Sequence, residues 1–226
     1  MRKPSHLTDA DEEVQPGLAA VPTLRERKLV AVREAIWDAA TDLFAVRGYD
    51  ETTVDEIAQA AGISPRSFFR YFLSKGDLMS YALLAYGNEL VAEIDACPQS
   101  YSLREVFRET VSRVAQRGVA RQLRTRKHLE ILNKSAAAAA AEMSRFSEVQ
   151  ALVAQAYARR LPRGVEHALT AGVMAGVTLQ LTGVAVRWCL EQGESDVSAT
   201  MERLLASLEG MFCSAGKRKA QSGRKH

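Results

Sequence analysis

A short segment near residue 70 concentrates guanidinium groups, hydroxyl groups and aromatic rings. It carries Arg66, Ser67, Phe69, Arg70 and Tyr71. A guanidinium can donate two hydrogen bonds to the O6 and N7 atoms of a guanine, while hydroxyl groups donate to phosphate oxygens. A helix that displays these side chains on one face is suited to enter a major groove and read base edges. This segment is therefore the first candidate for specific chemistry in the chain.

No comparable arrangement indicates catalysis or metal binding. The histidines lie far apart in the sequence, at His6, His128, His167 and His226, and so do the cysteines, at Cys97, Cys189 and Cys213. The chain contains no Cys-x-x-Cys pair, no Ser/His/Asp spacing and no phosphate-binding glycine loop. We expect no enzyme activity, no metal and no cofactor, and sparse unpaired cysteines fit a reducing compartment.

The net charge excludes a protein that binds polyanions through bulk charge. The 226 residues hold 30 Lys and Arg against 27 Asp and Glu, a net charge of +3. Five of the basic residues lie in residues 214–226, whereas residues 25–80 hold eight basic and nine acidic side chains. We expect a basic, disordered tail at 214–226 and a disordered leader at 1–24, which has no apolar run typical of a signal peptide.

Start and stop signals define the elements that would position the candidate segment. Apolar residues recur every three or four positions over residues 24–47, which predicts a helix that ends at Gly48. Thr53 and Glu56 then have the spacing of a capping box, in which each residue binds the backbone N–H of the other. A second helix of about eight residues should begin there.

The next helix begins after a tight turn. Gly62 opens this turn because glycine tolerates the positive φ that the turn needs. Ser64 can cap the following helix, which has proline at its first position and should run to Phe72. Two short helices joined in this way are typical of a helix-turn-helix unit, here at about residues 53–72. Phe68 and Phe72 should face the core and leave the arginines outside.

The segment from Val32 to Leu78 resembles the DNA-binding domain of TetR-type (tetracycline-repressor-like) transcriptional regulators. The resemblance rests on the string AATDLFAVRGYDETTVDEIAQAAGISPRSFFRYFLSKGDL. Its shared features are the anchors AA-x-x-LF and GY, the TTV-x-x-IA helix, the AGIS turn, and an aromatic helix that ends in YF and is followed by SK. Beyond this segment the chain resembles the family in helical architecture only.

The resemblance implies a set of DNA contacts. Hydroxyls that start the second helix would contact phosphate, the helix after the turn would contact bases and backbone, and the lysine that opens the next helix would contact phosphate. The implied set is Thr52, Thr53, Ser64, Arg66, Ser67, Phe69, Arg70, Tyr71 and Lys75. The chain departs from the family pattern at Arg66 and Phe69, where relatives often have a small residue and a tyrosine. We hypothesise that Arg66 or Arg70 reads a base.

The rest of the chain also reads as helix, so we predict an all-α fold with about nine helices. Ser74 should open a helix that runs to Pro98, and Ser102 another that ends near residue 118. Further helices are expected at about 120–134, 136–162, 165–191 and 196–212. The predicted domains are a helix-turn-helix DNA-binding domain at 25–80 and an effector-binding and dimerisation domain at 81–213.

The uncharged stretch at residues 168–186 permits two interpretations. Its length and a Gly-x-x-x-Gly pattern are typical of a transmembrane helix that dimerises. Its three glycines and four polar residues make it only weakly apolar, so we favour a soluble helix that packs closely on a partner and no membrane contact. With the last helix it would form a dimer interface through Gly172, Gly176, Leu204, Leu205 and Leu208.

The family resemblance also implies a ligand chamber in the second domain. Our candidate lining residues are Tyr81, Tyr86, Phe107, Val111, Ile131, Met143, Phe146, Tyr157, Met174 and Trp188; each could equally be an ordinary core residue. A basic stretch follows at Arg113, Arg117, Arg121, Arg124, Arg126 and Lys127. It would form a solvated face with a Glu109–Arg113 pair, or it would supply arginines that select an anionic effector.

These observations predict a cytoplasmic, homodimeric regulator that binds a pseudo-palindromic operator in double-stranded DNA. The resemblance implies repression that an unknown small-molecule effector relieves. The alternative is a ligand-binding or interaction protein of the same fold whose DNA binding is weak or lost, as the missing hydroxyl at Phe69 permits.

Overall fold

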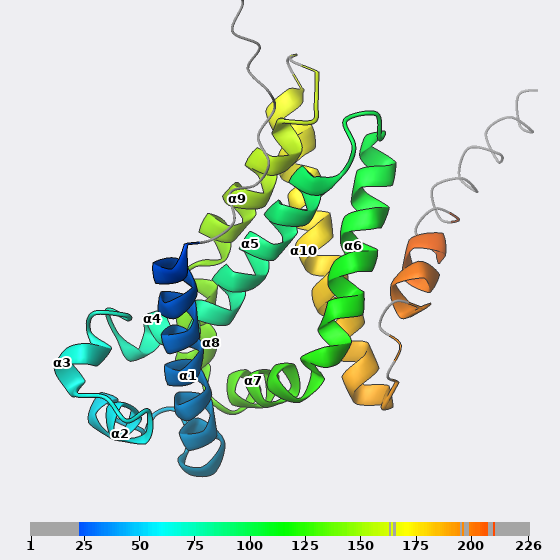
Figure 1. Ribbon diagram of the computed structural model, residues 1–226. Coiled ribbons are helices and arrows are strands. Elements are labelled where there is room, and N and C mark those ends of the chain that lie inside the picture. The colour runs from blue at the N-terminus through cyan, green and yellow to red at the C-terminus, as the bar shows by residue number, and fades with distance from the viewer. Residues whose placement is uncertain are drawn as a thin grey trace, which may run out of the picture.

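The computed structural model describes residues 23–162, 164, 166–194, 196, 199–207 and 210, without the side chains of residues 115, 116 and 118–120. Within these residues the chain forms helices and no strands (Figure 1). The helices are α1 (Leu24–Arg47), α2 (Val54–Ala60), α3 (Pro65–Phe68), α4 (Lys75–Met79), α5 (Tyr81–Ala96), α6 (Leu103–Ala120), α7 (Gln122–Lys134), α8 (Ala136–Met143), α9 (Phe146–Ala158) and α10 (His167–Gln192). Residues 199–207 are also helical. The predicted all-α fold is confirmed.

The first three helices begin where the sequence signals predict. α1 has the predicted bounds and is followed by Gly48, whose φ of 92° is in the region that favours glycine. Thr53 and Glu56 form the predicted capping box of α2. The turn between α2 and α3 contains Gly62 with φ 68°, and the Ser64 hydroxyl caps α3 by accepting from the Ser67 N–H.

A buried cluster fixes α1, α2, α3 and α4 against one another. Ile36 of α1, Ile57 of α2, Phe68 of α3 and Leu78 of α4 all belong to it, and Phe72 joins them just after α3. Phe68 is fully buried and Phe72 is 3% exposed, so both face the core as predicted. Because this packing fixes the angle between α2 and α3, it also fixes the direction in which the opposite face of α3 points.

α7 and α8 attach this N-terminal domain to the rest of the molecule. Ile131 of α7 and Ala138 of α8 are buried in the same cluster. At the junction of α7 and α8, the Ser135 hydroxyl donates to Asp50 at 2.9 Å. The Arg145 guanidinium donates to Asp77 of α4, also at 2.9 Å. The two domains therefore share apolar and polar contacts.

The remaining helices form a bundle. α5, α6, α9 and α10 run side by side, and α7 lies across one end of them (Figure 1). Leu90, Val149 and Val153 are fully buried in its core. The Tyr157 hydroxyl of α9 lies 2.9 Å from the Thr178 hydroxyl of α10, so a buried hydrogen bond joins these two helices. α5 and α9 approach very closely, because a Cβ atom at Gly87 would lie 2.6 Å from Cγ1 of Val149.

Within the described residues, two of the roughly nine predicted helices are each divided into two by an interruption. The helix expected from Ser74 to Pro98 breaks at Ser80, whose hydroxyl donates to the Asp77 carbonyl at 3.0 Å. The helix expected at 136–162 breaks at Ser144, whose hydroxyl donates to the Ala141 carbonyl at 2.6 Å. Such side-chain bonds to preceding carbonyls compete with the helical ladder. α3 is also shorter than predicted, and residues 69–72 continue as tight turns.

α10 is the one helix in the described part of the chain that is long and apolar enough to cross a membrane by composition. One side of it, which includes Ala171, Ala175, Thr178, Leu179 and Cys189, is buried against other helices. A core helix of a soluble protein passes the same test of composition. Residues 1–22 of the predicted leader and the whole predicted tail lie outside the described residues.

Candidate nucleic-acid interface and effector cavity

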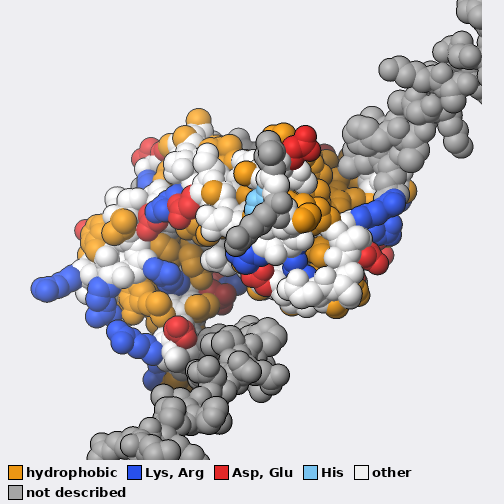
Figure 2. Space-filling view, turned by 90° about the horizontal axis from the view of Figure 1, so that it is seen from above, with side chains coloured by type: hydrophobic (Ala, Val, Ile, Leu, Met, Phe, Trp, Pro, Cys, Tyr) orange, Lys and Arg blue, Asp and Glu red, His pale blue; other side chains and the backbone are white. Residues whose placement is uncertain are grey.

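The outer face of α3 and of the turn after it carries the predicted base-reading side chains. Arg66, Phe69 and Arg70 are exposed, whereas Phe68 beneath them is buried. Figure 2 shows Lys and Arg side chains projecting, among apolar ones, at the end of the molecule where α2 and α3 lie. The structure therefore brings both arginines to one surface with their charges in solvent, as base or phosphate contacts require.

Tyr71 adds a hydroxyl to this surface. The Arg70 guanidinium lies 5.4 Å from the centre of the Tyr71 ring and donates to its hydroxyl at 3.3 Å. This contact orients a long side chain before any partner binds. Phe69 stacks edge-on against Phe68 with ring centres 5.5 Å apart, and it is 53% exposed. An apolar ring at this position can contact DNA through sugars, base faces or the methyl group of thymine, but it cannot donate a hydrogen bond to phosphate.

The predicted hydroxyl contacts differ in their availability. Thr52 is 1% exposed and its hydroxyl donates to the Gly48 carbonyl at 2.7 Å, so Thr52 is removed from the candidate phosphate contacts. Thr53 is exposed, although its hydroxyl also caps α2. Ser64 is exposed, and its hydroxyl donates to Ser67 Oγ at 3.0 Å. Thr53, Ser64 and Ser67 therefore remain candidates, with hydroxyls already held in local bonds.

Lys75 has a structural role that the sequence did not indicate. Its ammonium lies 2.6 Å from the Tyr49 carbonyl, 3.3 Å from the Asp50 carbonyl and 3.0 Å from the Thr52 carbonyl. It also lies 4.3 Å from the centre of the Tyr49 ring. An ammonium has three protons to donate, and here each has a backbone acceptor. The prediction of a phosphate contact is thus corrected to a clamp on the loop before α2.

Three acidic residues of the N-terminal domain, Asp38, Asp42 and Glu56, are engaged by groups other than those of the α3 surface. Asp38 pairs with Arg124, and Asp42 pairs with Lys127, both on α7. Glu56 closes the α2 capping box and pairs with Arg47. Carboxylates that are neutralised elsewhere leave the positive charges of α3 uncompensated.

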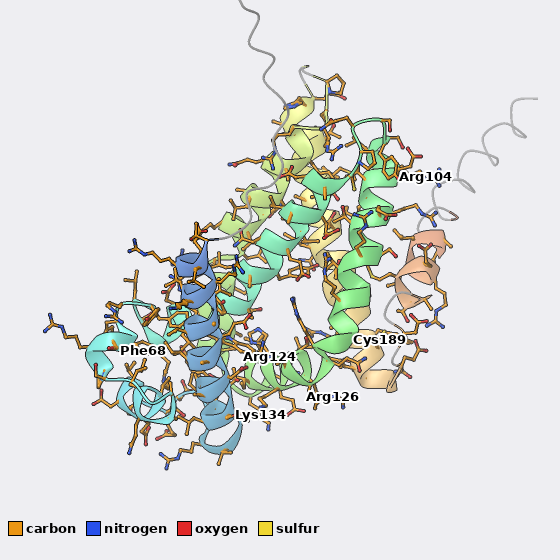
Figure 3. The ribbon with its side chains drawn as sticks, viewed as in Figure 1. Phe68, Arg104, Arg124, Arg126, Lys134 and Cys189 are labelled. Carbon is orange, nitrogen blue, oxygen red and sulfur yellow. The ribbon has the colours of Figure 1, made fainter. Side chains whose placement is uncertain are left out.

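A cavity of about 490 Å³ lies between the N-terminal domain and the bundle. Residues of α1, α5, α6, α7, α8 and α10 line it. They are Glu34, Trp37, Tyr81, Ala82, Leu83, Ala85, Tyr86, Glu89, Val114, Arg121, Arg124, Thr125, His128, Leu129, Glu142, Thr182, Gly183 and Val186. Figure 3 shows Arg124 on α7, beside α1. A space of this size is in the range of pockets that hold small molecules.

Only two of the ten predicted chamber residues line this cavity, Tyr81 and Tyr86. Six others are packed in apolar clusters: Phe107, Val111, Ile131, Phe146, Tyr157 and Met174. Met143 and Trp188 are 59% and 49% exposed. The ordinary-core interpretation was therefore right for most of the set. These eight residues were misassigned because apolar character alone does not distinguish a cavity wall from a packed core.

The basic stretch is solvent-exposed, with five of its side chains 39–57% exposed, and it also forms a series of ion pairs with α5 and α1. The predicted Glu109–Arg113 pair is present at 2.8 Å. Arg117 and Arg121 both reach Glu89 of α5 at 2.7 Å. Arg126 donates to the Leu190 carbonyl at 3.4 Å. Arg121 and Arg124 do line the cavity, although each already has a carboxylate partner.

Sequence reasoning missed a buried polar pair in the cavity wall and the tryptophan beside it. His128 of α7 pairs with Glu142 of α8 through Nε2, and Trp37 of α1 faces His128 with ring centres 5.9 Å apart. These three residues lie far apart in sequence, and no spacing rule connects them. No cluster of His, Cys, Asp and Glu suited to a metal occurs among the described residues.

The predicted dimer residues divide into two groups. A Cβ atom at Gly172 would meet nothing within 4 Å, and one at Gly176 would meet only a side-chain atom of Gln150. Gly172 therefore has open space beside it, whereas Gly176 lies beside the Gln150 side chain of α9, and both are half-buried. Leu205 is 6% exposed and hence faces its own chain, whereas Leu204 is half-buried beside the cluster around Val111. Leu208 lies outside the described residues.

Two family models match the chain. Residues 36–82 match the model described as bacterial regulatory proteins of the tetR family, and residues 101–212 match the model of the MftR C-terminal domain. The first match contains α2 and α3 with the turn between them. The second contains α6 to α10, which form most of the bundle and of the cavity wall.

Curated relatives agree with these models. The chain is similar to the HTH-type transcriptional regulator TcmR of Streptomyces glaucescens, with 34% identity over 97 residues, or 41% of this chain and 43% of TcmR. It is also similar to MftR of Mycobacterium tuberculosis, provisionally named a mycofactocin biosynthesis transcriptional regulator, with 28% identity over 125 residues, or 55% of this chain and 63% of MftR. The matched part thus spans less than two thirds of either relative.

A solved structure shows the same fold. The crystal structure of a protein named as a TetR-family transcriptional regulator from Syntrophomonas wolfei superposes with a TM-score of 0.56 at 17% sequence identity. The superposition covers 80% of this chain and 95% of that one, so it includes both the N-terminal domain and the bundle.

Proposed function

Because the chain belongs to the TetR family of bacterial transcriptional regulators, we propose that it binds an operator in double-stranded DNA and releases it when a small molecule binds. The observation that carries this proposal is the surface of α3, where Arg66 and Arg70 are exposed above the buried Phe68. Repression is the proposed outcome because it is typical of the family. A regulator of this kind acts in the cytoplasm and catalyses no reaction.

A two-fold dimer would present two such surfaces to one operator. α10 exposes Leu169, Val173, Val177, Val184 and Trp188, at 39–67% exposure. Their spacing of four and seven residues places them in one stripe along the helix. Gly172 and Gly176 flank this stripe and would allow close approach of a second copy. A dimer through α10 would place two α3 helices on half-sites about one helical turn apart, or a multiple of it.

The cavity supports release by a ligand. Its wall includes Glu34 and Trp37 of α1 as well as Thr182 and Val186 of α10. A ligand therefore touches both the helix that carries the DNA-binding domain and the helix of the proposed dimer interface. If the ligand fits best when the two α3 helices are wrongly spaced, it lowers operator affinity, and DNA lowers ligand affinity by the same factor.

Salt dependence of DNA binding tests the proposal. Binding of a labelled duplex from the region upstream of its own gene should weaken steeply between about 50 and about 200 mM salt, because phosphate contacts release counterions. An unrelated duplex of equal length is the control and should bind more weakly. Absent or salt-independent binding would favour the alternative, a ligand-binding or interaction protein of the same fold.

A further inference from the structure

The cavity wall contains polar atoms that no protein group satisfies. In the described part of the chain, five buried side-chain nitrogen or oxygen atoms lack a hydrogen-bond partner. Three of them belong to cavity-lining residues: Trp37 Nε1, Tyr86 Oη and His128 Nδ1. Buried polar groups are nearly always paired. We propose that the effector is a neutral aromatic molecule with one carbonyl-type acceptor and one hydroxyl or N–H donor; its role as effector rests on the proposed function.

The buried indole N–H of Trp37 requires a hydrogen-bond acceptor on the ligand. Trp37 is 6% exposed, and its indole N–H can only donate. A carbonyl, ether or ring nitrogen of the ligand would satisfy this donor, whereas an ammonium group would not. The guanidinium of Arg124 lies 5.8 Å from the centre of the Trp37 ring and limits the movement of the indole.

The buried Nδ1 of His128 calls for a hydrogen-bond donor on the ligand. The residue is 8% exposed, and its Nε2 faces the Glu142 carboxylate. A carboxylate accepts, so Nε2 donates to it, and in a neutral ring this tautomer leaves Nδ1 as an acceptor. A ligand hydroxyl or N–H is the matching group.

The Tyr86 hydroxyl can donate to the acceptor of the ligand or accept from its donor. Burial raises the pKa of Tyr86, so it stays a neutral phenol that can donate or accept. The neighbouring Thr182 hydroxyl partly offsets this rise in the pKa of Tyr86. The two hydroxyls are not placed to form a hydrogen bond, because the Thr182 hydroxyl donates to the Thr178 carbonyl at 2.9 Å.

The charges of the wall favour a neutral ligand. Arg121 and Arg124, the two arginines of the wall, pair with Glu89 and Asp38, so an anionic ligand would have to displace a carboxylate. Glu34 could attract a cation, but it is exposed and hence solvated, and the Glu142 carboxylate is engaged by His128 Nε2. A cation would also leave the indole N–H of Trp37 without an acceptor. The rings of Trp37, Tyr81, Tyr86 and His128 supply apolar faces for an aromatic ligand.

Fluorescence of one tryptophan gives a direct test in the full-length protein. The chain has two tryptophans, and Trp188 is 49% exposed on α10, so Trp188→Phe leaves Trp37 as the single reporter. The probes are 6-hydroxyflavone, which has both required groups, flavone, which lacks the donor, and flavone-6-carboxylate, which is anionic. We expect 6-hydroxyflavone to quench Trp37 and to bind about three- to tenfold more tightly than flavone, the value of one hydrogen bond. Absence of quenching by 6-hydroxyflavone, or tightest binding of the carboxylate, would overturn the proposal.

Two tyrosine variants provide a matched comparison by calorimetry. Tyr86→Phe removes a hydroxyl without a partner, so thermal stability should be unchanged or higher while affinity for 6-hydroxyflavone falls about three- to tenfold. Tyr157→Phe removes a hydroxyl that is bonded to Thr178 outside the cavity, so stability should fall while affinity is unchanged. Unchanged affinity in Tyr86→Phe would contradict the proposed contacts. Because these titrations contain no DNA, failure of operator binding would count against the proposed function and not against the ligand class.

Discussion

Arg124 of α7 and Asp38 of α1 form an ion pair that joins the bundle to the DNA-binding domain. One turn further along α7, Lys127 forms a second pair with Asp42 of α1. Arg124 also contacts the Trp37 ring and lines the cavity. A ligand that moves Arg124 or Trp37 would therefore act directly on the helix that supports α2 and α3.

The Arg124–Asp38 pair should contribute little to stability by itself. Both side chains are about half exposed, at 44% and 43%, and pairs of this kind are worth about 0.2–1 kcal/mol. We expect Asp38→Asn and Arg124→Gln each to lower the free energy of unfolding by such an amount. The free energy of unfolding of the double variant should fall by little more than that of the less stable single variant, as measured in a thermal double-mutant cycle. Fully additive losses would show that the pair does not form in solution.

Lys75→Met should reduce stability and leave the salt dependence of operator binding unchanged. The substitution removes the donor to three carbonyls, which we expect to cost about 1–3 kcal/mol. A phosphate-contacting lysine would instead lower the salt slope by about 1 when it is replaced. Arg66→Ala is the control, because Arg66 is exposed and its loss should leave the unfolding temperature unaltered. A stable Lys75→Met with a reduced slope would restore the phosphate contact first predicted.

Gly87→Ala tests the close contact of α5 and α9. A Cβ atom at this position would lie 2.6 Å from Val149 Cγ1, so the helices must separate or Val149 must move. Overpacking of this kind typically costs about 1–3 kcal/mol. Adding Val149→Ala should recover part of the loss in chemical unfolding experiments. A Gly87→Ala protein as stable as the parent would mean that α5 and α9 lie further apart.

The α2 capping box should weaken in acid. The Thr53 backbone N–H and hydroxyl hold the pKa of Glu56 below its ordinary value of 4.5. Because the pKa of Glu56 is lower in the folded than in the unfolded protein, ionised Glu56 stabilises the fold at pH values above its unfolded-state pKa. This stabilisation is lost as the pH falls through the folded-state pKa. The difference in unfolding temperature between the parent and Glu56→Gln should thus be present at neutral pH and shrink below pH 4.5. A difference that does not vary with pH would contradict this account of the cap.

The exposed stripe of α10 should control oligomeric state. We expect Val177→Glu to produce monomers in sedimentation experiments, because the charge would be buried between two copies. Leu123→Glu is the matched control, since Leu123 is 85% exposed on α7 and lies outside this stripe. Dimers that persist in Val177→Glu, or that dissociate equally in both variants, would exclude α10 as the interface.

The N-terminal domain could be predicted closely because its signals are local. The bounds of α1, the cap at Thr53, the turn at Gly62 and the burial of Phe68 each depend on residues within a few positions of one another. The break at Ser80 was missed because a serine inside a helical pattern can point outward or bind a preceding carbonyl, and sequence does not distinguish the two.

The cavity could not be predicted in the same way because its residues meet across the fold. Trp37 and His128 are adjacent in space only because α7 packs on α1, and the ions that neutralise Arg121 and Arg124 come from α5 and α1. Lys75 was misassigned for the same reason, since its acceptors lie more than twenty residues earlier in the chain. Non-local contacts decided these roles.

Selection of bound fragments from genomic DNA by the full-length protein tests the central claim most directly. We expect a pseudo-palindromic motif with two half-sites and binding that weakens steeply with salt. Arg66→Ala should lose sequence preference at one position of each half-site, where the parent discriminates between bases by about 1–3 kcal/mol. A uniform loss of affinity in Arg66→Ala would restrict that residue to the backbone. Recovery of no enriched motif, with binding insensitive to salt, would contradict the claim that this chain reads DNA.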